Sequence, residues 1–143
     1  MILIAGGFDE EPVAGCVRQV RQAGIVCQLV GLVFGPVVGQ NGLKLWTDAS
    51  LETALIGPPP QWLIVAGGVA CTRALGRDPR VQQLAEAVLN GGGQVALTAT
   101  ARPALRGDPA WARLQGRMVV QPAEQSIHTF TSALLQGRAH LPR

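Results

Sequence analysis

The stretch Gln94 to Ala104, Gln-Val-Ala-Leu-Thr-Ala-Thr-Ala-Arg-Pro-Ala, carries the pattern that decides the fold. Its apolar run, Val95 to Leu97, predicts a buried strand. Arg102-Pro103 predicts the first turn of a helix, because proline lacks an N–H that would be unpaired there anyway. A second stretch, Trp62-Leu-Ile-Val-Ala-Gly-Gly-Val-Ala70, is another apolar strand that runs into a Gly-Gly turn. Ligands of open parallel sheets bind where carboxyl ends of strands face helix N-termini, so we expect these stretches to line one crevice.

The rest of the chain alternates between strand and helix patterns. Strands are predicted at 2–5, 25–30, 62–66, 94–98 and 117–120. Helices are predicted from Asp9 to the Gly24 region, from Ser50 to Leu55, from Asp78-Pro79 to Asn90, and from Ser126 to Gln136. Turn residues between β-prone pieces predict a small hairpin over Gly35 to Trp46. This alternation predicts an α/β fold, with the strands parallel and helices on both faces of the sheet.

Composition limits the class of protein. At 143 residues, the chain is expected to form a single domain over residues 1–143. No apolar run approaches the roughly 20 residues that a membrane span needs, and Met1 leads straight into the first strand without a signal-peptide pattern. Three cysteines without metal-ligand spacing are typical of a reducing compartment. We therefore expect a cytoplasmic protein that does not bind membranes.

The sequence motifs of common cofactors and metals do not occur. There is no P-loop and no G-x-G-x-x-G, and the Gly91-Gly92-Gly93 run precedes a strand instead of opening a helix, so we expect no cofactor. The histidines, His128 and His140, stand alone late in the chain, and no metal site is expected.

The net charge of +3 is spread along the chain. A basic cluster that could meet phosphate is formed by Arg73, Arg77 and Arg80. No dense basic run is interleaved with aromatic residues, which argues against nucleic-acid binding.

The order of several segments resembles the ThiJ/PfpI superfamily. These segments are Ile2-Leu-Ile-Ala-Gly-Gly-Phe-Asp-Glu10, Val20-Arg-Gln-Ala-Gly-Ile25, Asp48-Ala-Ser-Leu-Glu52, Trp62-Leu-Ile-Val-Ala-Gly-Gly68 and Ala99-Thr-Ala-Arg-Pro103. The last of them falls where the family carries its nucleophile elbow. The resemblance implies a class I glutamine amidotransferase-like, flavodoxin-like fold: a three-layer α/β/α sandwich with a mostly parallel central sheet. It also implies a homodimer.

Three positions that the family uses in catalysis carry other residues here. Thr100 stands where the resemblance places a nucleophilic cysteine, with Arg102 in place of a glycine. Pro12 stands in the register of the acid that would partner that cysteine, and Gln121 stands where many members show histidine before proline. The turn Gly67-Gly68, which would supply oxyanion N–H groups, remains. Because a threonine hydroxyl needs an adjacent base to become a nucleophile, the resemblance implies lost catalysis.

Three functional hypotheses follow. The leading one is a catalytically inactive ThiJ/PfpI-like protein that binds a small ligand or a protein partner. The second is a divergent hydrolase or hydratase that uses Thr100 or Cys71, since a thiol after the Gly67-Gly68 turn could be activated by a helix start. The third is a structural subunit that dimerises with itself or with a paralogue.

The candidate ligand-binding residues are expected to meet at the crevice between Gly68 and Thr100. Helix starts give both sides partial positive charge, and Arg102 adds a guanidinium suited to carboxylate or phosphate oxygens. A ligand is therefore expected to be a small anion. In the alternative, Arg102 points to solvent or pairs with Glu10, and the crevice is closed. The full ligand-binding set is Glu10, Gly67, Gly68, Cys71, Thr100 and Arg102.

Two local expectations complete the site. Cys16 and Cys27 fall on apolar patterns and are expected to be poorly reactive, whereas Cys71 is expected to be the most accessible thiol. Because a β-branched residue tolerates positive φ poorly, Thr100 is expected to have a relaxed backbone.

Overall fold

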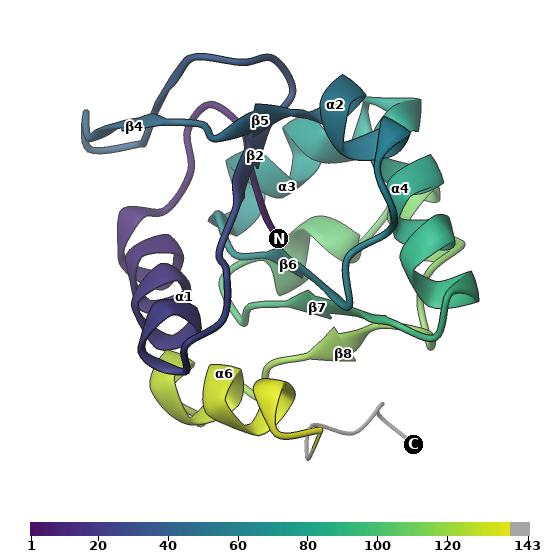
Figure 1. The fold of residues 1–143 in the computed structure, drawn as a ribbon. Coiled ribbons are helices and arrows are strands. Elements are labelled where there is room, and N and C mark those ends of the chain that lie inside the picture. Colours follow the sequence, from purple (N-terminus) through teal and green to yellow (C-terminus); the bar gives the residue numbers. More distant parts are fainter. Residues whose placement is uncertain (138–143) are drawn as a thin grey trace.

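A computed structural model describes residues 1–137 and has a six-stranded parallel sheet at its centre (Figure 1). The strands lie in the order β5-β2-β1-β6-β7-β8. Their bounds are Ile2–Ile4 (β1), Leu29–Gly31 (β2), Ala49–Ser50 (β5), Trp62–Val65 (β6), Gln94–Leu97 (β7) and Val119–Val120 (β8). Trp62 pairs with Gln94, so β6 and β7 are parallel neighbours. The prediction of a mostly parallel α/β fold is thereby confirmed.

Helices lie on both sides of this sheet. Figure 1 shows α1 (Glu10–Gln22) and α6 (Ile127–Leu135) together on one side. The other helices are α2 (Leu51–Ile56), α3 (Gly68–Gly76), α4 (Pro79–Asn90), the 3-10 helix η1 (Arg102–Leu105) and α5 (Pro109–Ala112). Because both faces are covered, the central strands are buried along almost their whole length.

Side-chain caps explain where several helices begin. The carboxylate of Asp78 accepts the Arg80 N–H at 3.0 Å, and the hydroxyl of Ser50 accepts the Thr53 N–H at 3.2 Å. The hydroxyl of Ser126 accepts a first-turn N–H of α6 in the same way. Each side chain satisfies an amide that has no partner within its helix. The helix starts predicted at these residues are therefore confirmed.

The second strand is shorter than the sequence pattern predicts. It begins at Leu29, and Val26, inside the apolar run, is 87% exposed. The neighbouring strand β1 has only three residues, which pair with Leu29–Gly31, so the chain before Leu29 has no strand to pair with. The last strand is likewise limited to Val119–Val120.

The predicted hairpin is present and lies over the end of β1. Its strands, β3 (Pro36–Val38) and β4 (Lys44–Trp46), are antiparallel and form a separate two-stranded sheet. The Gly7 N–H donates to the Val38 carbonyl at 2.9 Å, and the Phe8 carbonyl accepts the Gln40 N–H at 3.0 Å. Phe8 is consequently buried beneath the hairpin.

No helix within residues 1–137 has the length and apolar character needed to cross a membrane. Of the two histidines, His128 lies on an exposed position of α6, and His140 lies outside the described residues.

Candidate functional site

The direction of chain crossovers reverses between β1 and β6, which is where open α/β sheets bind their ligands. Here the segment after β1 packs directly on the turn after β6. The Asp9 N–H donates to the Gly67 carbonyl at 2.7 Å, and the ring of Phe8 is buried. The hairpin lies over Phe8 from the other side. This part of the sheet edge is therefore filled by protein.

The Gly67-Gly68 turn is a close-packing site. Both glycines are buried. A Cβ on Gly67 would lie 2.7 Å from the Cβ of Cys71, and one on Gly68 would lie 3.1 Å from the Cβ of Asp9. Gly68 also has a φ of +78°, a conformation that side chains rarely adopt. Contact with neighbouring side chains thus explains both glycines.

The prediction that Cys71 is the most accessible thiol is wrong. Cys71 is fully buried, and its sulfur accepts the Ala5 N–H at 3.2 Å. Burial raises the pKa of the Cys71 thiol to about 11, although this hydrogen bond opposes the change. The cause is helical position, because α3 starts at Gly68 and turns Cys71 inward against the sheet. Cys16 is buried as predicted, and Cys27 is the partly exposed cysteine.

Glu10 binds the hairpin instead of Arg102. Its Oε1 accepts the backbone N–H of Asn41 at 2.7 Å, and its Oε2 accepts the Asn41 side-chain amide at 2.7 Å. Desolvation raises the pKa of the Glu10 carboxyl, but the Asn41 hydrogen bonds outweigh it and hold that pKa below its usual value. Glu10 therefore connects α1 to the hairpin. Pro12, in the expected register of an acid, is buried in the first turn of α1.

Thr100 lies exposed on the turn after β7. Its hydroxyl shares a hydrogen bond of 3.2 Å with the Thr98 hydroxyl, which also lies 3.3 Å from the Ala66 carbonyl. No residue other than glycine has positive φ within residues 1–137, so the expected relaxed backbone of Thr100 is confirmed. Among the described hydrogen bonds, the Thr100 hydroxyl has no contact with a histidine or a carboxylate.

The amides that follow Thr100 already have partners. The Ala101 N–H donates to the Thr98 carbonyl at 3.0 Å, and the Arg102 N–H donates to the Ala99 carbonyl at 3.2 Å. The predicted helix start is a four-residue 3-10 helix, η1, and not the first turn of a longer helix. These N–H groups consequently hold the turn together and do not point into a crevice.

Gln121 holds the same turn from the side. Its Oε1 accepts the Ala99 N–H at 2.9 Å, and its Nε2 donates to the Gln125 carbonyl at 2.6 Å. Gln121 is buried, with a relative exposure of 6%. Gln121 therefore joins the turn after β7 to the segment between β8 and α6.

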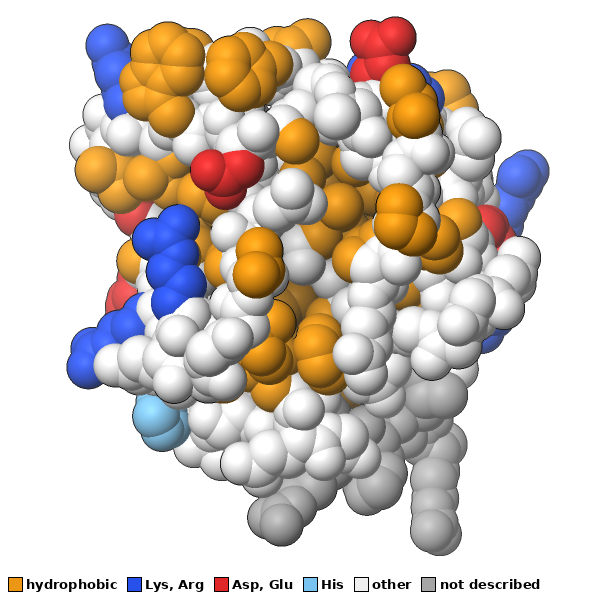
Figure 2. Space-filling view, in the orientation of Figure 1, with side chains coloured by type: hydrophobic (Ala, Val, Ile, Leu, Met, Phe, Trp, Pro, Cys, Tyr) orange, Lys and Arg blue, Asp and Glu red, His pale blue; other side chains and the backbone are white. Residues whose placement is uncertain are grey.

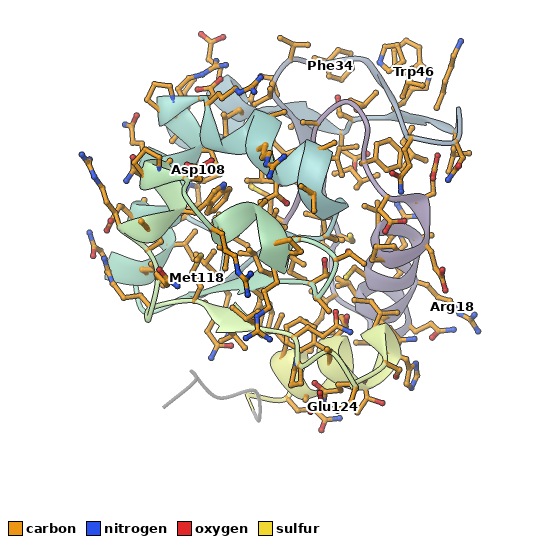
Figure 3. All side chains as sticks on the ribbon, turned by 180° about the vertical axis from the view of Figure 1, so that it is seen from behind. Arg18, Phe34, Trp46, Asp108, Met118 and Glu124 are labelled. Carbon is orange, nitrogen blue, oxygen red and sulfur yellow. The ribbon has the colours of Figure 1, made fainter. Side chains whose placement is uncertain are left out.

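A cavity of about 390 Å³ opens beside this segment and is named here the β8 cavity. Arg102 and Gln121 both line it. Its apolar wall comes from Leu105, Met118, Val120 and Pro122, and Glu124 also lines it. Met118 and Glu124 are labelled in Figure 3. Arg102 thus lines the same cavity as Gln121, whereas Gly67, Gly68, Cys71 and Glu10 do not line it.

Sequence reasoning missed the apolar wall of this cavity. Val120 belongs to the edge strand β8 and Met118 directly precedes it, so the apolar run of residues 118–120 at the edge of the sheet was the available signal. Within residues 1–137, no group of three or more His, Cys, Asp or Glu side chains could hold a metal ion.

Comparison with known proteins places this geometry in context. The family model described as the DJ-1/PfpI family matches residues 1–111. A comparison with curated proteins found no match.

Solved structures share the fold. Schizosaccharomyces pombe DJ-1 is 15% identical with a TM-score of 0.73, and the match covers 97% of this chain and 90% of that chain. A DJ-1 superfamily protein from Salmonella typhimurium is 18% identical with a TM-score of 0.72, covering 95% of this chain and 89% of that chain. Drosophila melanogaster DJ-1beta is 24% identical with a TM-score of 0.67 over 73% of this chain. This chain spans only 56% of DJ-1beta and 60% of Toxoplasma gondii DJ-1.

Proposed function

Because the chain belongs to the DJ-1/PfpI family, we propose that it is a non-catalytic member that binds a small carboxylate ligand in the β8 cavity. One observation carries the proposal. Arg102 and Gln121 stand at two of the positions where this chain departs from the family pattern, and both line the same cavity. Arg102 stands where the family pattern has a small residue, and its guanidinium is suited to binding a carboxylate.

The state of the two candidate nucleophiles supports a non-catalytic role. A thiol must ionise to attack, and burial raises the pKa of Cys71 to about 11. The Thr100 hydroxyl is hydrogen-bonded to the Thr98 hydroxyl, and a hydroxyl is a poor general base. The divergent-hydrolase alternative would require Thr100 or Cys71 to acquire a base from elsewhere.

The chemistry of the cavity suggests the class of ligand. Its volume, about 390 Å³, lies within the range of about 300–1,000 Å³ typical of small-molecule sites. The guanidinium of Arg102 forms no hydrogen bond or ion pair with another residue of the described chain, so its donors are available. The wall of Leu105, Met118 and Val120 would cover an apolar body. The ligand is therefore a small molecule with one carboxylate and an apolar part.

Thermal unfolding with a panel of carboxylates, including benzoate, hexanoate and succinate, tests this proposal. A ligand at about 100 times its dissociation constant should stabilise the protein by about 2.7 kcal/mol. Arg102→Ala should abolish the effect, and Arg102→Lys should weaken it because lysine lacks the planar fork of donors. Arg18→Gln, on the exposed face of α1, is the matched charge control. No stabilisation by any carboxylate, or stabilisation that persists in Arg102→Ala, would overturn the proposal.

A second proposal, homodimerisation, is supported by the hairpin. Exposed apolar side chains gather on and beside it; this hairpin patch consists of Val33, Phe34, Val38, Leu43 and Trp46. Figure 2 shows hydrophobic side chains together at the top of the molecule, over β4. Phe34 and Trp46 are each 66% exposed and pack edge to face, with ring centroids 6.5 Å apart. Contiguous exposed apolar surface of this kind is typical of an interface, and a second copy is the partner proposed here.

We also propose that residues 1–143 form one domain in a reducing, cytoplasmic compartment. A single core cluster that draws on elements from β1 to α6 supports the first point. The second is supported by the three free cysteines, because such thiols persist in reducing surroundings.

A further inference from the structure

A second cavity, of about 470 Å³, lies between the end of α3 and the segment that leads into α5. It is named here the arginine pocket. Three arginines line it: Arg73, Arg77 and Arg106. Gly107 and Asp108 also line it, and Asp108 is the only acidic residue of the lining. Asp108 marks this region in Figure 3.

The walls of the pocket are fixed to one another. The indole N–H of Trp111 donates to the Thr72 carbonyl at 3.0 Å, and both residues are buried. Gly76 allows the close approach, since a Cβ there would lie 2.7 Å from both Asp108 Oδ2 and Trp111 Nε1. This packing sets the distance between α3, which carries Arg73 and Arg77, and the segment that carries Arg106. The three arginines therefore line a space whose two sides are held together by buried contacts.

The charges in the pocket do not neutralise one another. Elsewhere in the described chain, Arg80 pairs with Asp78 at 2.7 Å and Arg117 pairs with Glu86 at 2.8 Å. No hydrogen bond or ion pair engages the guanidinium of Arg73, Arg77 or Arg106 within residues 1–137. The one carboxylate of the pocket, Asp108, accepts the Ala110 N–H at 2.9 Å as the cap of α5. Three cations and one anion leave an excess of two positive charges.

Helix electrostatics account for only part of this arrangement. Arg73 and Arg77 stand at the C-terminal end of α3, where cations are favoured by the helix dipole. Arg106 lies outside any helix and approaches from another segment. The helix dipole thus explains the positions of Arg73 and Arg77. It does not explain Arg106, nor why all three arginines line one cavity.

We propose that the arginine pocket binds a phosphoryl group of a small molecule. The two negative charges of a phosphoryl dianion match the two excess positive charges. Each guanidinium can also donate two parallel hydrogen bonds to phosphoryl oxygens. The cavity has room for an organic part beyond the phosphoryl group. This inference does not rest on the carboxylate ligand proposed for the β8 cavity, because Arg102 lines that cavity and not this one.

Calorimetric titration with inorganic pyrophosphate and with phenyl phosphate, at low ionic strength, tests the proposal. Binding of either ligand is expected, and tighter binding of phenyl phosphate would identify an organic phosphate as the source. Arg106→Gln and Arg77→Gln should each weaken binding about tenfold or more, the effect of losing a charge-assisted hydrogen bond. Amide chemical shifts should change at Arg77 and Gly107.

Two controls make the outcome decisive. Arg113→Gln removes the same charge from the nearby end of α5 without altering the pocket lining, and Arg102→Ala alters only the β8 cavity. Both should retain wild-type affinity for the phosphoryl probe. The proposal is overturned if neither probe binds, if Arg113→Gln weakens binding as much as Arg106→Gln, or if a short oligonucleotide binds more tightly than both probes. Two pocket variants are used so that a folding defect in one leaves the other informative.

Discussion

The side chain of Gln121 accepts the Ala99 N–H at 2.9 Å, across 22 residues of sequence. With its other end on the Gln125 carbonyl, it fixes the turn that carries Thr100. Gln121 stands where the family resemblance places a histidine, so this position now performs a structural task.

Replacing Gln121 should therefore destabilise the fold. Gln121→Ala removes the acceptor of the half-buried Ala99 N–H, which is expected to lower the free energy of unfolding by about 0.5–1.5 kcal/mol. Urea denaturation measures the effect. Gln125→Ala is the matched control, because Gln125 contributes only its backbone carbonyl. Equal effects of the two substitutions would contradict the assigned role.

The three thiols should react in the order that their exposure dictates. Iodoacetamide should label Cys27 first, because Cys16 and Cys71 are buried. Mass spectrometry of the native protein at neutral pH gives the order, and the denatured protein should lose this selectivity. Labelling of Cys71 before Cys27 would show that the turn after β6 opens, and would favour the hydrolase alternative.

Stability should decrease at alkaline pH. Burial raises the pKa of Cys71 to about 11 from an ordinary value of 9.0. Between these values the unfolded chain releases the proton while the native chain retains it, so the free energy of unfolding falls as pH rises. The loss attributable to this thiol is at most about 3 kcal/mol. Denaturation of wild type and Cys71→Ala between about pH 8.5 and 11 should give a shallower decline in the variant; identical slopes would refute the linkage.

Gly67 should be intolerant of a methyl group. In Gly67→Ala the new carbon would overlap the buried Cys71 side chain, at 2.7 Å from its Cβ. Overpacking of this kind costs about 1–3 kcal/mol. Gly6→Ala, in the turn after the adjacent strand β1, is the control because nothing lies within 4 Å of its added carbon. Thermal unfolding should separate the two variants; unchanged stability of Gly67→Ala would contradict the packing described here.

The proposed homodimer should depend on the hairpin patch. Trp46→Gln removes an aromatic ring that is 66% exposed, and is expected to raise the dimer dissociation constant about tenfold or more, as at an interface hot spot. Val26→Gln, also at an exposed apolar residue but outside the patch, should leave the dimer unchanged. Analytical ultracentrifugation measures both. A wild-type monomer, or a dimer indifferent to Trp46→Gln, would remove support for this interface.

The predictable part of the fold is the part encoded locally. The Asp78-Pro79 start of α4 depends on neighbouring residues, and the structure confirms it. The same signature recurs at Asp108-Pro109, where it begins α5, although no helix was expected there. The start of β2 was misplaced because it depends on the length of β1, a distant segment.

The candidate site was harder to predict for a related reason. Burial of Cys71 follows from its position in α3, where Leu75, four residues later, is also buried; that spacing was the missed signal. The contact between Gln121 and Ala99 leaves no local trace in the sequence. The placement of Arg102 beside the β8 cavity is not encoded locally either, because it follows from the 3-10 geometry of η1.

The buried indole of Trp111 has a practical consequence. It lies next to Gly76 of the arginine pocket and is shielded from water. The indole of Trp46, in contrast, is exposed to solvent on the hairpin. The two fluorophores should consequently differ in emission wavelength and in their quenching by iodide. Once Trp62, the third tryptophan of the chain, is replaced by phenylalanine, events at the pocket and events at the hairpin can thus be followed separately through intrinsic fluorescence, without an attached label.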